Sequence, residues 1–269
     1  MIIIFSLFSV IIMREDKELY NFFAKSEKLF QPGLSIDSVI FGFHDNELKV
    51  LLTKLKKTHW WSLAGGFVYK NEHVDDAAIR ILRERTGLSN IFLQQFYVFG
   101  DPKRSDKKFH VKRMQHTGWP ISKNYWLLQR FVTVGYYALV EFSHVSPTVD
   151  YMSDLCDWYD IHDLPPLIMD HGEVLKKALN VLRTQLKYQP VGYNLLPQKF
   201  TMPELQKLYE TILDKKLDRR NFQRKMLGYA ILKRLEKRRK GGAHKAPYLY
   251  SFDLRKYHKA LEEGLRGGW

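Results

Sequence analysis

Apolar and polar residues alternate with the period of β-strands in several stretches of the first half of the chain. Residues 35–43 and 48–55 alternate or run apolar around a turn at residues 44–46, which predicts two paired strands. Residues 92–99 and 131–142 predict further strands, and the second of these is rich in β-branched and aromatic side chains. Strands interrupted by one or two helices indicate a mixed sheet with helices on its faces.

A helical period replaces this alternation after Val74. Apolar residues recur there at helical spacing, Asp75 and Asp76 stand near the start, and Gly87 supplies a stop. A further helix is expected from about residue 172 to residue 186, and a stretch containing proline and glycine follows it as a natural linker. The predicted segments are an N-terminal extension at residues 1–32, a first domain at 33–187 and a second domain at 188–269.

The C-terminal region shows the order of elements expected of a winged helix. Thr201 and Glu204 form a capping box, and the apolar stripe behind it predicts a helix that ends near Leu213. Residues 230–235 and 247–252 are expected to form two strands around a basic tip, which would be the wing. An RNA-binding module and a merely solvated basic subdomain are the alternatives for this region.

A second helix of this region is expected to begin at Asp218. At about 100° per residue, Phe222 and Met226 share its buried side, which leaves a basic, hydrogen-bonding outer surface. Such a helix fits the major groove of double-stranded DNA, where Arg and Gln read base edges and basic groups hold phosphates. The candidate DNA contacts are Arg219, Arg220, Asn221, Gln223, Arg224 and Lys225 on the helix, and Arg238, Arg239, Lys240, His244 and Lys245 at the tip of the wing.

Charge is concentrated in two segments of the chain. The whole sequence has a net charge of +14, whereas residues 188–269 alone carry 19 basic and 8 acidic side chains. Residues 103–130 form a basic insertion with 8 basic and 1 acidic side chains. A basic excess confined in this way is the electrostatic footprint of a polyphosphate partner. The insertion itself could touch DNA, bind an anionic effector or be a solvated loop.

One segment carries polar residues and glycines at regular spacing around the helix expected after Val74. These residues are Gly66, Glu72, Arg80, Glu84 and Gly87. Their spacing resembles the Nudix box, in which a loop and a helix place three glutamates on one helical face to hold magnesium over a diphosphate.

The glutamate positions of the box are occupied here by Ile81, Glu84 and Arg85. A hard divalent cation needs several oxygen ligands, and one carboxylate beside a guanidinium supplies too few. We therefore expect no metal, no cofactor and no catalysis, with Glu72 and Arg80 as a structural ion pair. The alternative is a Nudix hydrolase of nucleoside diphosphate derivatives such as ADP-ribose, with an unusual metal set that includes Glu72 and Glu84.

A wider resemblance covers nearly the whole chain from about residue 33 to residue 252, apart from the insertion. The matching segments are residues 190–201, 209–213, 218–225, 99–102 and 132–139, with Arg130, Asp170 and His171. With these segments the sequence resembles the Nudix-related transcriptional regulators. This resemblance implies an α+β protein in which a Nudix α/β/α sandwich with a mixed sheet is followed by a C-terminal winged-helix domain. It also implies a homodimeric repressor that binds a palindromic operator and senses a metabolite.

Some members of this family respond to ADP-ribose, and a branch with a degraded box responds to sugars such as arabinose. Because two carboxylate positions of the box are lost here, we expect a neutral sugar, held by aromatic faces and a few polar groups. The protein would then be a sugar-responsive repressor. The expected effector contacts are Trp61, Gly66, Glu84, Phe99, Asp101, Arg130 and Tyr136.

The single cysteine, Cys156, excludes an internal disulfide framework and suits a reducing cytoplasm. For Asp170 and His171 the sequence suggests helix capping and packing, because it offers no nucleophilic partner. Residues 1–12 are almost wholly apolar but too short to span a bilayer comfortably, and no basic residue precedes them. We therefore expect no membrane segment and a translation start at Met13.

Overall fold

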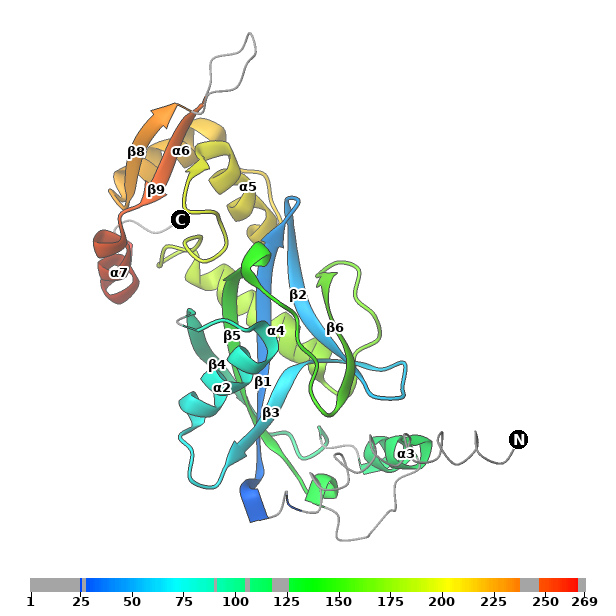
Figure 1. Cartoon of the computed structure of the whole chain (residues 1–269). Coiled ribbons are helices and arrows are strands. Elements are labelled where there is room, and N and C mark those ends of the chain that lie inside the picture. Colours follow the sequence, from blue (N-terminus) through cyan, green and yellow to red (C-terminus); the bar gives the residue numbers. More distant parts are fainter. Residues whose placement is uncertain are drawn as a thin grey trace, which may run out of the picture.

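The computed structural model describes residues 25, 28–89, 91–104, 107–117, 126–237 and 247–265. Figure 1 shows a large sheet with its helices at one end of the molecule and a small sheet with the helices α5, α6 and α7 at the other. The larger part contains β1 (Phe30–His44), β2 (Glu47–Leu55), β3 (Trp61–Tyr69), α2 (Val74–Thr86), β4 (Leu93–Phe99), α3 (Lys107–Thr117), η1 (Trp126–Leu128), β5 (Val132–Glu141), η2 (Phe142–His144), β6 (Ser153–Asp160) and α4 (His171–Gln185).

The large sheet is mixed, as the strand pattern predicts. Its strand order is β4-β5-β1-β3-β2-β6, so β4 and β6 form the two edges. The neighbouring strands β1 and β5 pair in parallel, with Leu34 opposite Val132 and Phe43 opposite Glu141, while the other pairs are antiparallel. The parallel pair is possible because β1 and β5 are far apart in the chain and are joined by a long crossover.

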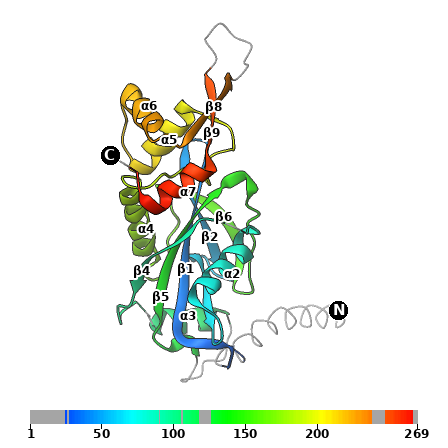
Figure 2. The ribbon, with the colours of Figure 1, turned by 90° about the vertical axis from the view of Figure 1, so that its left-hand side faces the viewer.

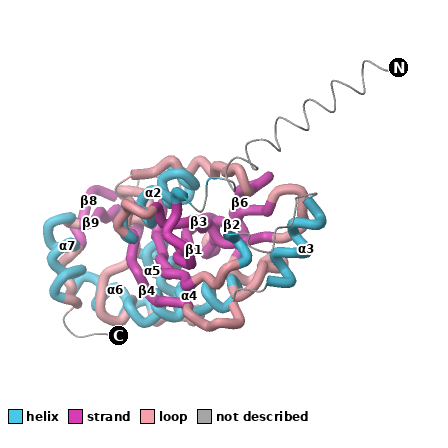
Figure 3. Tube along the Cα trace, turned by 90° about the horizontal axis from the view of Figure 1, so that it is seen from below, coloured by secondary structure: helices cyan, strands magenta, loops and turns pink. Residues whose placement is uncertain are grey.

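Helices cover both faces of this sheet, which confirms the predicted sandwich. Successive residues of a strand point to opposite faces, so Val39 and Phe41 of β1 pack in the cluster that contains the apolar side of α4. Ile36 of β1 lies on the other face, in a cluster with Ala78 and Ile81 of α2. Figures 2 and 3 show α2 and α4 on opposite sides of the strands.

The smaller part has the elements of a winged helix. Its first helix, α5 (Met202–Leu213), begins with the predicted capping box, in which Thr201 accepts from the Glu204 amide while the Glu204 side chain accepts from the Thr201 amide. The expected second helix follows, with Asp218 accepting from the Asn221 amide at 2.8 Å. The remaining elements are β7 (Phe200–Thr201), α6 (Arg219–Gly228), β8 (Leu232–Lys237), β9 (Tyr248–Phe252) and α7 (Leu254–Glu263), with the strand order β7-β9-β8.

The two parts share one apolar core. One cluster of buried residues contains side chains of β1, β2 and α4 together with side chains of α5, α6 and β9. The stretch predicted as a linker contributes to this core, since Val191, Leu195 and Leu196 are buried. Two hydrogen bonds also join the parts: Arg183 Nε donates to the Ile212 carbonyl at 2.7 Å, and Thr211 Oγ1 donates to the Asn46 carbonyl at 3.0 Å.

Several elements escape the sequence patterns. Strand β3 was not predicted as a strand, and it contains the two glycines Gly65 and Gly66. In addition, β6 is an edge strand without clear alternation, α3 lies within the basic insertion, and α7 follows the last predicted strand. Strand β1 also begins earlier than predicted, at Phe30. In the part of the chain that the structure describes, no helix is long and apolar enough to cross a membrane.

Candidate functional site

An ion pair holds the frame of the Nudix-like box by joining Glu72, which precedes α2, to Arg80 in the middle of this helix. Arg80 donates from Nε to Glu72 Oε1 at 2.7 Å and from Nη2 to Glu72 Oε2 at 2.8 Å. Arg80 also donates to the Phe67 carbonyl and lies over the Tyr69 ring. Burial raises the pKa of Glu72, but the hydrogen bonds from Arg80 and the Tyr69 amide outweigh it and hold the pKa below its ordinary value. Both oxygens of Glu72 are therefore used by the protein itself.

The glutamate positions of the box lie in three different environments. Ile81 packs against the backbone of Gly66, where an added Cβ would come within 2.8 Å of Ile81 Cδ1. The Glu84 side chain is 45% exposed and lies 3.5 Å from Arg80 Nη1. Arg85 is buried and forms an ion pair with Asp150.

These side chains do not fit a magnesium site. An alkyl group and a guanidinium offer no oxygen, so Glu84 would be the sole carboxylate ligand on this face of the helix. Among the described residues, no group of three or more His, Cys, Asp or Glu side chains lies close enough together to hold a metal ion.

Beside the box, the sheet carries a cavity of about 120 Å³. It is lined by residues of β1, β2 and β3, by Arg104 and His110, and by residues from the segments 127–133, 150–153 and 168–171. A second depression of about 340 Å³, the box hollow, lies over Gly66, Arg80 and Glu84. The cavity and the box hollow share the residues Gly65, Gly66, Phe67, Arg85, Asp150 and Tyr151.

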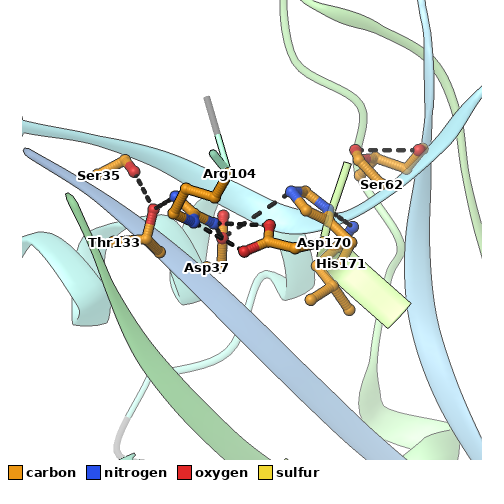
Figure 4. A network of polar contacts seen from close by, with 9 residues as sticks. Ser35, Asp37, Ser62, Arg104, Thr133, Asp170 and His171 are labelled. Carbon is orange, nitrogen blue, oxygen red and sulfur yellow. Dashed lines mark hydrogen bonds and ion pairs between the residues drawn. The ribbon is translucent and has the colours of Figure 1, made fainter. Parts of the chain in front are cut away.

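A buried polar network lies beside the cavity, and most of its residues line it (Figure 4). Arg104 donates from Nε and Nη2 to the two carboxylate oxygens of Asp170, at 2.8 and 3.0 Å, and from Nη2 to Asp37 Oδ2 at 3.1 Å. It also donates to the hydroxyl of Thr133, which lies 2.5 Å from the hydroxyl of Ser35. Burial lowers the pKa of Arg104, but the two carboxylates outweigh this effect and raise it, so the guanidinium stays charged.

His171 completes this network at the start of α4. The amide of Leu63 donates to its Nδ1 at 2.9 Å, and its Nε2 lies 3.9 Å from Asp37 Oδ2. Burial lowers the pKa of His171, although Asp37 and Asp170 oppose the shift. The ring is therefore neutral near pH 7, with the proton on Nε2 because Nδ1 accepts a hydrogen bond.

Helix capping by the Asp170 side chain, which the sequence suggests, is corrected by the structure. Asp170 occupies the N-cap position of α4 but makes no capping hydrogen bond with its side chain. Its carboxylate binds Arg104 instead. The predicted packing of His171 is confirmed, because this residue is buried.

Of the expected effector contacts, Gly66 alone lines the cavity, and Gly66 and Glu84 line the box hollow. The other side chains lie elsewhere. Trp61 packs edge-on against Tyr159 in the core, and the Tyr136 hydroxyl donates to Asp75 of α2.

The remaining expected contacts lie where β4 ends and β5 begins. Phe99 packs beside Gly135 of β5, at the position where a Cβ would meet its ring. Asp101 accepts from the Lys103 amide at 2.8 Å, and Arg130 donates to the Gly100 carbonyl at 2.7 Å. These expected contacts therefore stay predictions, and the cavity network and Arg85 are further candidates because they line the cavity or the box hollow.

The residues of the network carry weak sequence signals. Arg104 belongs to the basic insertion, where lysines dominate the charge, and Asp37 and Thr133 are polar residues inside predicted strands. A polar residue within an apolar strand could have marked the network, because buried carboxylates need partners. Arg104 and His110 of the insertion line the cavity. The insertion also packs beside the sheet, since the ring centre of Phe109 in α3 lies 5.0 Å from that of Trp60.

The candidate DNA-binding helix presents the expected surface. Phe222 and Met226 are buried, and Arg219, Arg220, Asn221 and Arg224 are exposed. Arg224 Nη2 donates to Asn221 Oδ1 at 2.8 Å, which aligns these two side chains on the outer face.

Two further helix residues, Gln223 and Lys225, are half-buried. Burial, together with nearby Lys215, lowers the pKa of Lys225. The expected contacts at the tip of the wing lie outside the described residues; these are Arg238, Arg239, Lys240, His244 and Lys245.

Two family models match the chain. The NUDIX domain model matches residues 33–178, and the model of the NrtR DNA-binding winged helix domain matches residues 192–252. These matches correspond to the large sheet with its helices and to the elements from the segment before β7 through β9.

The chain is similar to several known proteins. It is 28% identical over 233 residues to the "ADPR responsive transcriptional repressor NtrR" of Acinetobacter baylyi, covering 84% of each chain. It is 24% identical to an ADP-ribose pyrophosphatase of Methanocaldococcus jannaschii, over 62% of this chain and 80% of that protein.

Among solved structures, Shewanella oneidensis NrtR in complex with a 27mer DNA has a TM-score of 0.68 and 25% identity to this chain. The match covers 88% of this chain and 99% of that one. The matched structure includes both parts of the molecule. On these grounds the chain belongs to the NUDIX domain family, and its Nudix domain is followed by a C-terminal DNA-binding winged helix of the NrtR type.

Proposed function

We propose that this protein is a transcriptional repressor that binds operator DNA through α6 and the wing and is released by a small molecule bound in its Nudix domain. The observation that carries the proposal is the exposed basic face of α6 on a winged helix that shares its core with the Nudix domain. A short anchored helix with Arg and Asn on its outer face suits readout of base edges in the major groove. We also propose that the protein binds a palindromic operator as a homodimer.

For the effector we propose ADP-ribose or a closely related nucleoside diphosphate derivative. The support is the relative from A. baylyi, which is described as ADPR responsive and is similar over most of both chains. The comparisons give no support to a sugar such as arabinose. The cavity and the box hollow adjoin each other, which suits an elongated ligand with chemically different ends.

We further propose that the effector is bound without being hydrolysed. The support is the set of residues at the glutamate positions, where Ile81 and Arg85 cannot bind magnesium. Hydrolysis of the effector is the rival function, and the likeness to an ADP-ribose pyrophosphatase makes it worth testing directly.

Helix α4 offers a path between the two sites. Its first residues, with Asp170 before them, belong to the polar network of the cavity. Near its other end, Arg183 donates to the carbonyl of Ile212 in the last turn of α5. A ligand that repositions the network would displace α4 and, with it, the winged helix. The ligand shifts the equilibrium between the operator-bound and the released state only if it binds the released state more tightly.

Two assays on the full-length protein test the proposal. In the first, anisotropy of labelled DNA from upstream of its own operon is compared with a shuffled fragment at rising salt. Preferential binding with a steep salt dependence supports the repressor, whereas equal affinity for both fragments or for RNA contradicts it.

In the second assay, ADP-ribose and other nucleoside diphosphate derivatives are incubated with the protein and magnesium, and products are separated by chromatography. The proposal expects no turnover above a protein-free control. Robust magnesium-dependent turnover that is lost in Glu84→Gln would establish the hydrolase instead.

A further inference from the structure

Arg85 stands where the Nudix box has a metal-binding glutamate, and its guanidinium is buried between two hollows. It is 4% exposed and lines both the cavity and the box hollow. Its Nη2 donates to Asp150 and lies 3.4 Å from the carbonyl oxygen of Gly65. Its Nε is buried and meets no hydrogen-bond acceptor among the described residues. A buried N–H without an acceptor is costly, so this edge of the guanidinium suits an incoming anion.

Three of the described arginines line the two hollows, and they differ in how many of their N–H groups already have a hydrogen-bond partner. Arg80 engages both oxygens of Glu72, and Arg104 engages both oxygens of Asp170. Arg85 contacts one oxygen of its carboxylate partner through one nitrogen. Among the described arginines of the two hollows, Arg85 thus has the most donor capacity left for a ligand.

Asp150 has hydrogen-bond partners other than Arg85 that would hold it in place if the ion pair with Arg85 were broken. Its Oδ1 accepts from the Met152 amide at 2.9 Å and from the Ser153 hydroxyl at 2.7 Å, independently of the oxygen that faces Arg85. The same segment is anchored to the end of α2, where the Thr148 amide donates to the Arg85 carbonyl at 3.0 Å. A ligand anion could therefore take the guanidinium from Asp150 while the surrounding backbone stays in place.

We propose that Arg85 replaces the metal ion of the Nudix box as the binding partner of phosphate. The diphosphate of the effector lies at the junction of the two hollows and accepts hydrogen bonds from Nε and a terminal nitrogen of Arg85, without magnesium. A planar guanidinium matches two phosphate oxygens and supplies the positive charge that a cation would otherwise bring. The inference rests on the proposed effector class. It adds that Arg85 binds the diphosphate and that this binding needs no metal ion.

The first test uses the unmodified protein. Full-length protein is titrated calorimetrically with inorganic pyrophosphate and with ADP-ribose, in excess EDTA and in magnesium. We expect both ligands to bind in EDTA, with dissociation constants within about threefold of those in magnesium. Binding in magnesium alone, or no binding of pyrophosphate in either buffer, overturns the inference.

The second test removes the guanidinium. Arg85→Met should weaken pyrophosphate binding about 10- to 100-fold, the effect expected for a hydrogen bond to a charged group. The control is Arg83→Met, since Arg83 is exposed on the same helix and should leave binding unchanged. Arg85→Met combined with Asp150→Asn avoids leaving an unpaired buried carboxylate and should lose binding equally. Wild-type affinity in the double variant overturns the inference.

The failure of this inference can be told apart from failure of the proposed function. If the protein binds its operator but pyrophosphate does not bind in EDTA, the role of Arg85 is wrong and the repressor stands. If the protein shows no preference for operator DNA while Arg85→Met weakens pyrophosphate binding as expected, the repressor is wrong and the anion site stands. Operator binding also reports whether each variant is folded, because α6 lies at the far end of the molecule from α3, whose His110 lines the cavity (Figures 1 and 2).

Discussion

Arg104→Met removes the guanidinium that lies between two buried carboxylates. Arg104 is 8% exposed, and it holds Asp37 and both oxygens of Asp170. Methionine fills most of the same volume, so the change tests charge and hydrogen bonding more than packing. The two carboxylates would be left facing each other near the neutral ring of His171.

The size of the effect follows from these contacts. Removing one partner of a buried ion pair costs about 3–5 kcal/mol, because the other partner is left charged and unpaired. For a protein of this size each kcal/mol lowers the melting temperature by about 2–4 °C, which gives a fall of roughly 6–20 °C. Replacing both carboxylates by amides in the same variant, with Asp37→Asn and Asp170→Asn, should recover a large part of the loss.

Urea unfolding followed by tryptophan fluorescence measures this change. The control is Lys103→Met, because Lys103 is exposed next to Arg104 in the chain. If Arg104→Met unfolds at the same urea concentration as Lys103→Met, the network is not a buried ion-pair system and the reasoning is refuted. A destabilisation that the two Asn substitutions fail to relieve would show that packing, not charge, accounts for the loss.

Three further predictions concern separate parts of the molecule. Arg220→Ala and Arg224→Ala should each weaken specific operator binding by about 1–3 kcal/mol in anisotropy titrations if each reads a base, and unchanged affinity in both would remove them from the interface. Because burial lowers the pKa of His171, the unfolded chain takes up a proton that the folded ring resists; stability should therefore fall as the pH drops below about 6.5, and His171→Gln should flatten this dependence in urea titrations. Burial raises the pKa of the Cys156 thiol to about 11, so alkylation by iodoacetamide near pH 7 should be far slower than that of glutathione, and an equal rate would contradict the burial.

The fold could be predicted from the sequence wherever a local pattern was strong. The helical spacing after Val74, its stop at Gly87 and the capping box at Thr201 each correspond to an observed helix boundary or cap. Strand β6 could not be predicted in this way, because an edge strand that is partly exposed on both faces loses the alternation that marks a strand. Helix α3 was hidden by the basic composition of the insertion, whose apolar residues show little periodicity.

Only the Nudix-like box of the candidate site could be predicted from the sequence. Spacing alone identifies Ile81, Glu84 and Arg85, because they lie on one helix. The cavity network joins Asp37, Arg104 and residues near the start of α4, which are separated by more than sixty positions in the chain. Such long-range pairing follows from the parallel β1–β5 contact and the crossover around it, which no local pattern specifies.

The central claim is that a Nudix domain here acts as a sensor that controls a winged helix. Its most direct test is a titration of the preformed protein–operator complex with ADP-ribose in EDTA, followed by fluorescence anisotropy of the labelled DNA and by chromatography of the ligand. We predict that the DNA is released while ADP-ribose remains intact. DNA that stays bound at saturating ADP-ribose, or release that requires magnesium and yields AMP, would contradict the claim.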